Sequence, residues 1–368
     1  MTQRENKSRI IKALSSSHFQ TGQYSITITL GNDDSIAQSK LMQDNCDMSK
    51  LLILSKYKII VILSIISIIW LTFLSQDVAA QIEPSFLYHL SNFSGPIPYN
   101  WAKISVDPVR NETYVIGSAG KGVRVFNEQG MEIFRFADDG SLGNVDDVTL
   151  KEDGNMFVLS RSRGKTSIIV CNFRGIPQSE VQLKELPSAF ADFVPSRIVY
   201  LKGSIYQASL STGKIVVTDT EGNFRSGYDP YTLLGIKEKD KVNTELGGFA
   251  VDYEGNMLFT IPVLFSAYRL SPEGNLIGFG GRGGTPGKFN IVAEIAADDK
   301  GFYYLTDRLK SAVIVYDKNF QFIEEFGYRG SRPENLISPS DLAIDSGGRL
   351  YVSQLRNRGI SVFKITYK

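Results

Sequence analysis

Two short apolar runs, separated by an acidic turn that contains glycine, recur along most of this chain. The clearest copies span residues 248–259, 294–305 and 340–353. Apolar runs joined by a tight turn predict two antiparallel strands. The pattern occurs six times. Its first run ends at positions about 44–51 residues apart: Asp107, Lys151, Leu201, Asp252, Asp298 and Asp345.

Each unit continues with two more apolar runs. The third run is clear at residues 122–126, 312–316 and 360–363, and the fourth ends near Phe-Gly, as at 322–327. A strand-only repeat of about 45 residues is typical of a β-propeller, in which four antiparallel strands make one blade. We therefore predict an all-β, six-bladed propeller of four-stranded antiparallel blades over residues 81–368.

The sixth unit stops at Lys368, after its third strand. Residues 86–91 have the pattern of a fourth strand, similar to that of 322–327. An open ring would leave two unpaired sheet edges. We therefore predict that the strand at the start of the domain completes the last blade.

The sequence motif of the repeat resembles that of NHL-repeat six-bladed propellers over about residues 84–368. The resemblance rests on Ile/Leu-Ala-Val/Ile-Asp, Leu-Tyr-Val, the Phe-Gly endings and Gly-Lys-Phe-Asn at 287–290. Lys151 and Leu201 replace the aspartate in blades 2 and 3, so we expect irregular first turns there. The family contains enzymes, RNA binders and protein binders, so the resemblance implies a fold and leaves the function open.

An uncharged apolar run at residues 59–74 follows several lysines and precedes the small residues of 78–80. This pattern predicts a signal peptide or a transmembrane anchor helix over 48–80, and either would place the domain outside the cytoplasm. We expect a periplasmic, secreted or membrane-anchored protein in a bacterial setting. Residues 1–47 form a polar, irregular extension, and Met48 is a candidate for the true start.

Composition excludes several kinds of chemistry. The chain has 2 His and 2 Cys, too few for a multi-histidine metal site or a histidine-based triad in the domain. Residues 278–283 match the Gly-x-Gly-x-x-Gly motif, but the pattern of a further strand follows them. A dinucleotide-binding site needs a helix there, so the match does not indicate one. The formal net charge of +1 gives no electrostatic case for nucleic acid.

The innermost strand of each blade lines the channel of a propeller, so the residue before each first run should lie at the channel mouth. These residues are Lys103, Asp147, Arg197, Gly248, Glu294 and Asp341. We expect the two cations to balance the carboxylates without a cofactor. The alternative is a site for Ca²⁺ or Mg²⁺ made by Asp147, Glu294 and Asp341, as the resemblance to gluconolactonase-like propellers would imply.

The loops between second and third strands should share one face, and most of them are basic. Their cations are Lys121, Arg161, Arg163, Lys165, Lys214, Arg308, Lys310, Arg356 and Arg358. They predict docking of an anionic partner, or else are simply solvated. The loop of blade 4, residues 261–265, is apolar, and Phe265 is either an exposed anchor for a partner or part of a buried strand.

Together these features predict an exported or anchored, non-enzymatic binding propeller. Its partner would be a protein, a peptide or an anionic polymer of the cell envelope, held on the loop-rich face. The alternative is a metal-dependent, lactonase- or lyase-like hydrolase at the channel. The export signal argues against the RNA binding known for other members of the family, and the oligomeric state stays open.

Overall fold

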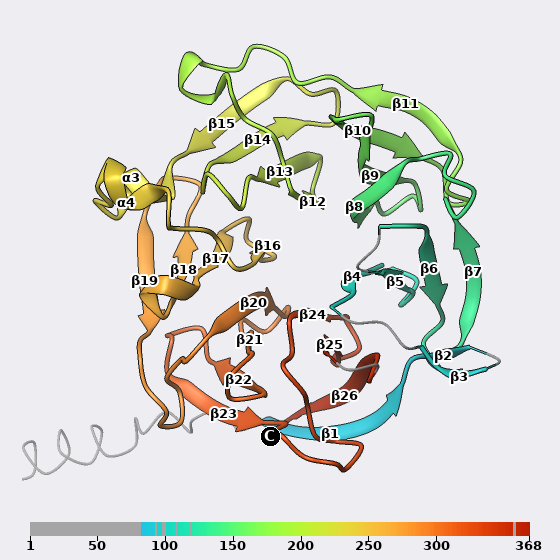
Figure 1. Ribbon diagram of the computed structural model, residues 1–368, viewed down its shortest axis with the longest axis vertical. Helices are drawn as coiled ribbons and strands as arrows, with labels where there is room; N and C mark the ends of the chain where they lie inside the picture. The colour runs from blue at the N-terminus through green and yellow to red at the C-terminus, as the bar shows by residue number, and fades with distance from the viewer. Residues whose placement is uncertain (1–81, 93, 98–100, 108, 118–119, 356–357) are drawn as a thin grey trace, which may run out of the picture. The chain divides into compact units, whose positions relative to one another are not determined.

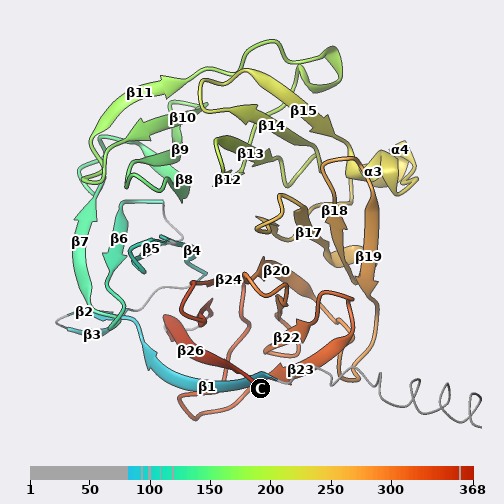
Figure 2. The ribbon, with the colours of Figure 1, turned by 180° about the vertical axis from the view of Figure 1, so that it is seen from behind.

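The computed structural model describes residues 82–368, apart from 93, 98–100, 108, 118–119 and 356–357. Six four-stranded antiparallel sheets are arranged in a ring around a central channel (Figures 1 and 2). The predicted six-bladed propeller is therefore confirmed.

The blades follow one another along the chain, and each runs from the channel to the perimeter. Blades 1 to 3 consist of β4 (Lys103–Val106), β5 (Thr113–Ile116), β6 (Val123–Phe126), β7 (Glu132–Phe136); β8 (Asn144–Leu150), β9 (Met156–Ser162), β10 (Lys165–Cys171), β11 (Pro177–Val181); and β12 (Arg197–Leu201), β13 (Ser204–Ala208), β14 (Ile215–Asp219), β15 (Phe224–Tyr228). Blades 4 to 6 consist of β16 (Phe249–Val251), β17 (Met257–Ile261), β18 (Ser266–Leu270), β19 (Leu276–Gly280); β20 (Val292–Ala297), β21 (Tyr303–Asp307), β22 (Ala312–Tyr316), β23 (Phe322–Phe326); and β24 (Asp341–Ile344), β25 (Arg349–Ser353), β26 (Ile360–Tyr367), β1 (Ile82–His89). The connecting segments contain the hairpin β2 (Ser91–Asn92) and β3 (Gly95–Pro96), and the short helices η2 (Ser188–Phe190), α3 (Pro230–Leu233), α4 (Glu238–Lys241) and η3 (Pro262–Leu264).

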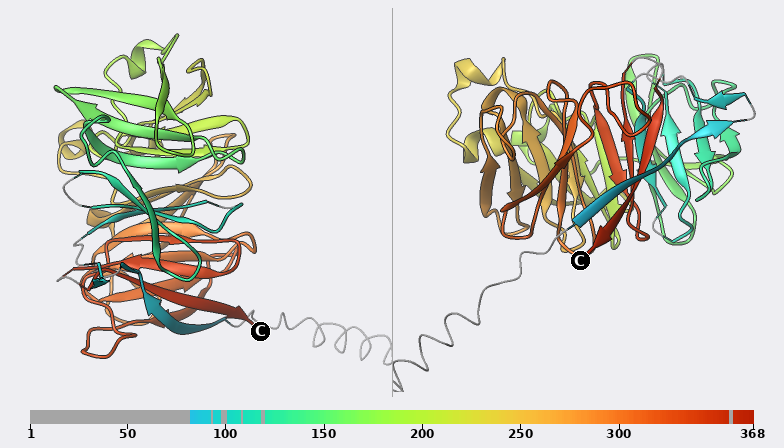
Figure 3. Two further views of the ribbon diagram at one scale, coloured as in Figure 1. Left: turned by 90° about the vertical axis from the view of Figure 1, so that its right-hand side faces the viewer. Right: turned by 90° about the horizontal axis from the view of Figure 1, so that it is seen from below.

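The ring closes as the sequence predicted. Strand β1 pairs with β26 in antiparallel register, from Ile82 opposite Tyr367 to His89 opposite Ser361. Figure 3 shows β1 lying along β26. The first described strand of the chain is thus the outer strand of the last blade, so both ends of the domain stabilise the same sheet.

The recurrent aspartate folds the turn between the first two strands of a blade. In blade 4, Asp252 Oδ1 accepts hydrogen bonds from the backbone N–H groups of Glu254 and Asn256, at 3.0 and 2.9 Å. Such side-chain to backbone bonds stabilise tight turns.

The two blades without this aspartate differ from each other. In blade 2 the turn keeps the same backbone hydrogen bonds, from Lys151 N–H to the Asn155 carbonyl and from Gly154 N–H to the Lys151 carbonyl. The expectation of an irregular turn is therefore wrong for blade 2. In blade 3 the turn shortens to Lys202 and Gly203, both with positive φ (48° and 78°), as in the tight turns that favour hairpins.

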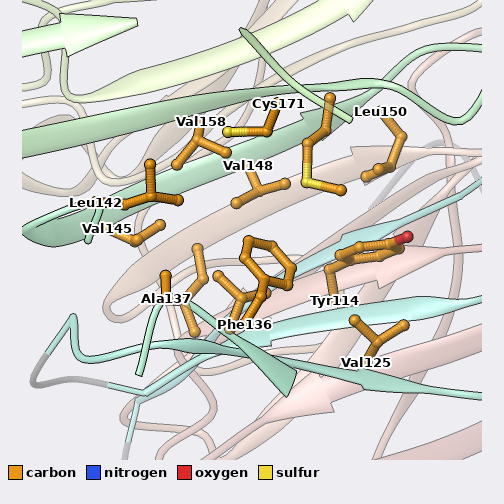
Figure 4. Packing of buried hydrophobic residues seen from close by; sticks show 13 residues of the cluster. Tyr114, Val125, Phe136, Ala137, Leu142, Val145, Val148, Leu150, Val158 and Cys171 are labelled. Atoms are coloured by element: carbon orange, nitrogen blue, oxygen red, sulfur yellow. The ribbon is translucent and has the colours of Figure 1, made fainter. Parts of the chain in front are cut away.

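Hydrophobic cores lie between neighbouring blades. Figure 4 shows the cluster between blades 1 and 2, where Phe136 packs near Val148 and Val158. Cys171 belongs to this cluster, and burial raises the pKa of its thiol to about 11. A thiol of this kind is unreactive at neutral pH, as expected for a structural cysteine.

The predicted extension 1–47 and the predicted signal or anchor 48–80 lie outside the described residues. Within the part of the chain that the structure describes, no helix is both long and apolar enough to span a bilayer.

Candidate functional site

The channel holds the charged residues that the sequence placed at its mouth. The first strands of the six blades line a cavity of about 240 Å³. Arg197, Asp147, Glu294 and Asp341 lie at the end where these strands begin, and all four are buried. Further along, the wall is formed by small side chains such as Ser105, Ala250 and Ala343.

Arg197 extends from blade 3 across the channel. Its Nη2 atom donates hydrogen bonds to Glu294 Oε2 of blade 5 and, at 2.8 Å, to Asp341 Oδ2 of blade 6. Its Nη1 atom lies 3.9 Å from Asp147 Oδ1 of blade 2. The three predicted carboxylates therefore converge, and the guanidinium of Arg197 lies at the point where they meet.

The same carboxylates also join neighbouring blades. Asp147 Oδ2 accepts the N–H of Ile198 at 2.9 Å, which links blade 2 to blade 3. Glu294 Oε1 accepts the N–H of Phe249 at 2.8 Å, which links blade 5 to blade 4.

The third carboxylate closes the ring in the same way. Asp341 Oδ1 accepts the N–H of Ile104 at 3.3 Å, across the seam between blades 6 and 1. Lys103 adds a bond from Nζ to the Asp146 carbonyl at 2.7 Å, between blades 1 and 2. The cluster thus holds the inner strands of the propeller together.

At the sixth predicted position, Gly248, a steric constraint explains why the residue is glycine. A Cβ atom there would lie 2.6 Å from the Cα atom of Glu294, closer than real contacts allow. Glycine in blade 4 therefore leaves the space in which Glu294 approaches the neighbouring strand.

Burial perturbs the ionisation of this cluster. Burial would lower the pKa of Arg197, but Glu294, Asp341 and Asp147 outweigh it, so the pKa is raised and the guanidinium stays charged. Burial raises the pKa of Glu294 to about 8, although the charge of Arg197 opposes this shift. Burial likewise raises the pKa of Asp341, and burial together with the charge of Arg197 lowers the pKa of Lys103.

The arrangement does not fit a Ca²⁺ or Mg²⁺ ion. Such ions need several oxygen ligands directed at one point, whereas these carboxylates face the guanidinium of Arg197 and backbone N–H groups. Over the described residues, no group of three or more His, Cys, Asp or Glu side chains could hold a metal ion.

Several of the predicted basic loop residues serve the fold itself. Arg161 pairs with Asp146 at 2.6 Å, and Lys310 forms a buried pair with Glu325 at 2.8 Å. Arg358 donates to the carbonyls of Gly330 and Arg332, both at 2.9 Å. Arg356 lies outside the described residues.

Two predicted arginines are exposed and available on the loop face, Arg163 and Arg308. No carboxylate of the described residues forms an ion pair with either. Arg308 lies over the ring of Trp101, with its Cζ atom 5.7 Å from the ring centroid.

The apolar loop of blade 4, residues 261–265, is partly a buried strand end and partly exposed, so it has features of both interpretations made from the sequence. Ile261 is buried at the end of β17, and the chain then turns through η3. Phe265 is half-buried, has a φ of 53° and lies beneath Arg282 at 5.1 Å. The exposed residues are instead Val263 and Leu264, at 54% and 41%.

These two residues begin a larger surface, which we call the apolar patch. Its members are all exposed: Trp101, Val263, Leu264, Ile291 and Leu309. Hydrogen bonds connect the loops of blades 4 and 5: Gly281 N–H donates to the Phe265 carbonyl, Phe289 N–H to the Gly281 carbonyl, and Arg308 N–H to the Ile291 carbonyl. Trp101 joins this surface through Arg308, which lies over its ring. Sequence reasoning missed Trp101, Ile291 and Leu309, because nothing in the sequence shows that these three residues, which lie far apart in the chain, are exposed on one face.

Comparisons with known proteins support the fold and the family resemblance. No protein-family model matches the chain. Human NHL repeat-containing protein 3 is 30% identical over 92 residues, which are 22% of this chain and 26% of that protein. The matched segment thus spans about a quarter of that relative.

Two solved structures share the architecture. A protein of unknown function from Bacteroides thetaiotaomicron VPI-5482 superposes with a TM-score of 0.58 at 13% identity, covering 78% of this chain and 77% of that one. A streptogramin B lyase superposes with a TM-score of 0.50 at 12% identity, covering 78% and 98%. At these identities the likeness shows the fold alone. With the repeat match, it supports an NHL-like propeller family, as the sequence predicted.

Proposed function

We propose that this protein is a non-enzymatic binding propeller that holds a partner on its loop-rich face. The observation that carries this proposal is the apolar patch, in which Leu309 is 66% exposed and Val263 is 54% exposed. Contiguous exposed apolar surface with a polar rim marks sites of protein interaction. The partner would be a protein or a peptide, or an anionic envelope polymer if the arginines dominate binding.

The charges around the patch favour an acidic partner. Arg282 and Arg308 lie over rings at its edge and have no carboxylate partner among the described residues. Exposed large apolar side chains beside arginines resemble the residues that form hot spots of protein interfaces. An acidic segment with one or two large apolar side chains would satisfy both features of the surface.

We further propose that the domain acts outside the cytoplasm. The support for this is the apolar segment 59–74 with its lysine flank and the small residues that follow it. Protease protection in intact cells and spheroplasts would test this, because a cytoplasmic domain would resist protease until the inner membrane is broken.

Affinity capture from a cell-envelope fraction tests the binding proposal. Leu309→Asp in the full-length protein would place a charge in the patch, and Val109→Asp is the matched control. Val109 is 57% exposed and lies in the first turn of blade 1, on the opposite face. We expect the Leu309 variant to lose captured proteins that the wild type and the control retain. Equal capture by both variants would refute the role of the patch.

The second candidate is a hydrolase of lactonase or lyase type at the channel. Its support is a buried carboxyl, Glu294, whose pKa is raised to about 8, since perturbed acids often mark functional sites. Glu294→Gln would abolish such an activity, whereas it would leave binding by the apolar patch intact. A turnover of lactone substrates that depends on Glu294 and an added divalent cation would overturn the binding proposal.

A further inference from the structure

A cavity of about 430 Å³ lies between the outer parts of blades 1 and 2. Two phenylalanines line it, Phe134 on strand β7 of blade 1 and Phe173 in the turn between β10 and β11 of blade 2. Its volume is within the range of pockets that hold small molecules, about 300–1,000 Å³. The turns that border it belong to the face of the propeller opposite the loop face, because the strands of a blade are antiparallel.

The turn that carries Phe173 differs from the equivalent turns of the other blades. Blades 1 to 5 share one turn between their third and fourth strands, in which the first residue donates its N–H to the carbonyl four positions on: Asn127 to Met131, Asn172 to Ile176, Asp219 to Asn223, Ser271 to Asn275, and Asp317 to Gln321. In four of these blades the next two residues include no aromatic side chain: Glu128 and Gln129, Thr220 and Glu221, Pro272 and Glu273, and Lys318 and Asn319. In blade 2 they are Phe173 and Arg174, so a ring followed by a guanidinium is particular to this turn.

The facing wall of the cavity also departs from the repeat. Phe134 is opposite Val125 in the pairing of β7 with β6. At the same register position the outer strands of blades 2 to 5 carry smaller or charged residues: Ser179, Ser226, Gly278 and Glu324. Phe134 and Phe173 are 40% and 62% exposed, so neither ring is needed to fill a core. Two aromatic departures from the repeat, on neighbouring blades, therefore line one cavity.

The cavity also has charged walls, and most of these charges already have partners within the protein. Its carboxylates accept hydrogen bonds from neighbouring side chains: Asp107 from Arg110 and Asp153 from Lys151, both at 3.0 Å, and Glu112 from the Tyr114 hydroxyl at 3.3 Å. Arg174 differs, because among the described residues no carboxylate forms an ion pair with it. Its guanidinium lies over the ring of Phe173, with Cζ 5.3 Å from the ring centroid. An acceptor on a ligand would therefore find the donors of Arg174 free beside the exposed ring.

We propose that this cavity binds a small aromatic acid. The ring of the ligand would pack against Phe134 and Phe173, since aromatic rings attract one another in offset or edge-to-face arrangements. Its carboxylate would accept hydrogen bonds from Arg174, whose planar guanidinium matches a carboxylate in two-point geometry. This site goes beyond the proposed function and shares no residue with the apolar patch, so each of the two can be refuted without the other.

The test uses the full-length protein and naphthoate as the probe, in titrations followed by saturation-transfer NMR. Three control compounds separate the contributions of the ring and the charge. Naphthalenemethanol keeps the rings without a charge, cyclohexanecarboxylate keeps the charge without an aromatic ring, and naphthylmethylamine reverses the charge. We expect saturable binding of naphthoate and at least about tenfold weaker binding of each control, which corresponds to about 1.4 kcal/mol.

Two variants in the turn of blade 2 make the test specific to this cavity, since Phe134 also borders a second cavity beside the β2–β3 hairpin. Arg174→Gln should weaken binding of naphthoate at least about tenfold and leave naphthalenemethanol unchanged. Phe173→Ser should weaken binding of both compounds. Lys318→Gln is the matched control, because Lys318 is an exposed cation in the equivalent turn of blade 5, and it should bind like the wild type. All three positions are exposed, so the variants should keep the Tm of the wild type to within a few degrees.

Three results would overturn the proposal. They are binding of naphthoate that does not saturate, equal weakening by Arg174→Gln and Lys318→Gln, and tighter binding of the amine than of the acid. A peptide with a C-terminal phenylalanine provides a fourth comparison. If it binds more tightly than naphthoate and depends on Arg174, the ligand is the end of a protein chain, and the assignment to a small molecule is wrong.

Discussion

Replacing Arg197 by methionine should destabilise the domain severely. Methionine keeps much of the volume of the side chain but leaves Glu294 and Asp341 without the guanidinium to which both are hydrogen-bonded. Both carboxylates are buried, at 3% and 5% exposure, so solvent cannot replace the lost charge. Without Arg197, each carboxyl group would either have to bind a proton or remain buried and charged with no cation beside it.

The expected magnitude follows from the cost of leaving a buried charge without its partner. Removing one member of a buried ion pair costs about 3–5 kcal/mol. Each kcal/mol lowers Tm by roughly 2–4 °C in slightly smaller domains. We therefore expect Arg197→Met to lower Tm by about 6 °C or more at neutral pH. Burial raises the pKa of both carboxyls and the charge of Arg197 lowers it, so without Arg197 they bind protons more readily. The loss should therefore become smaller in acid, where protonation removes the remaining unpaired charge.

The assay is thermal unfolding followed by circular dichroism between pH 5 and pH 8. A second protein combines Arg197→Met with Glu294→Gln and Asp341→Asn, which removes the guanidinium together with the two carboxylates that it hydrogen-bonds and leaves Asp147 and Lys103 in place. Removing one partner of a buried ion pair leaves an uncompensated buried charge, whereas removing both partners does not, so this triple variant should recover part of the lost Tm. The reasoning fails if Arg197→Met melts like the wild type, or if the triple variant is no more stable than the single one.

Three further predictions follow from the same structure. The raised pKa of Glu294 means that the folded state binds a proton more tightly than the unfolded state, so the free energy of unfolding should fall as pH rises from about 4.5 to about 8. Glu294→Gln should flatten this pH dependence in denaturant titrations. An unchanged dependence of the free energy of unfolding on pH would contradict the prediction. Deleting residues 82–92 removes β1, so we expect aggregation or loss of cooperative unfolding in calorimetry, whereas a sharp transition at the wild-type Tm would show that closure is dispensable. Excess chelator should leave Tm unchanged, because the guanidinium of Arg197 lies where the channel carboxylates meet. A metal at 100 times its Kd would contribute about 2.7 kcal/mol, so a fall of several degrees in Tm on adding chelator would contradict this prediction.

The blades could be predicted from the sequence because their information is local. Alternation, tight turns and the aspartate that binds its own turn, as at Asp252, all act within a dozen residues. The repeat carries this pattern around the ring, and the incomplete last unit led to the prediction of a closing strand at 86–91, which overlaps the observed strand 82–89. The channel positions could be predicted for the same reason, since each lies at or near the start of the apolar run of an inner strand.

The partners of those channel residues could not be predicted, because they depend on where six strands meet in space. Nothing near Arg197 in the chain indicates that its side chain crosses the channel to residues 97 and 144 positions away. The same holds for Glu294, which needs the space left by Gly248 on another blade. Long-range electrostatics of this kind arise only after the ring has closed.

The apolar patch also required the folded chain. The sequence of the blade 4 loop made Phe265 a candidate for the exposed anchor. In the structure the chain turns through a left-handed conformation at Phe265, which is half-buried, while its neighbour Leu264 is exposed. Trp101, Ile291 and Leu309 come from separate loops, and the sequence of each loop does not show that its apolar residue is exposed beside the others. Local sequence therefore determines strands and turns, because their interactions span a few residues, whereas surfaces and buried charge clusters are set by which distant segments the ring brings together.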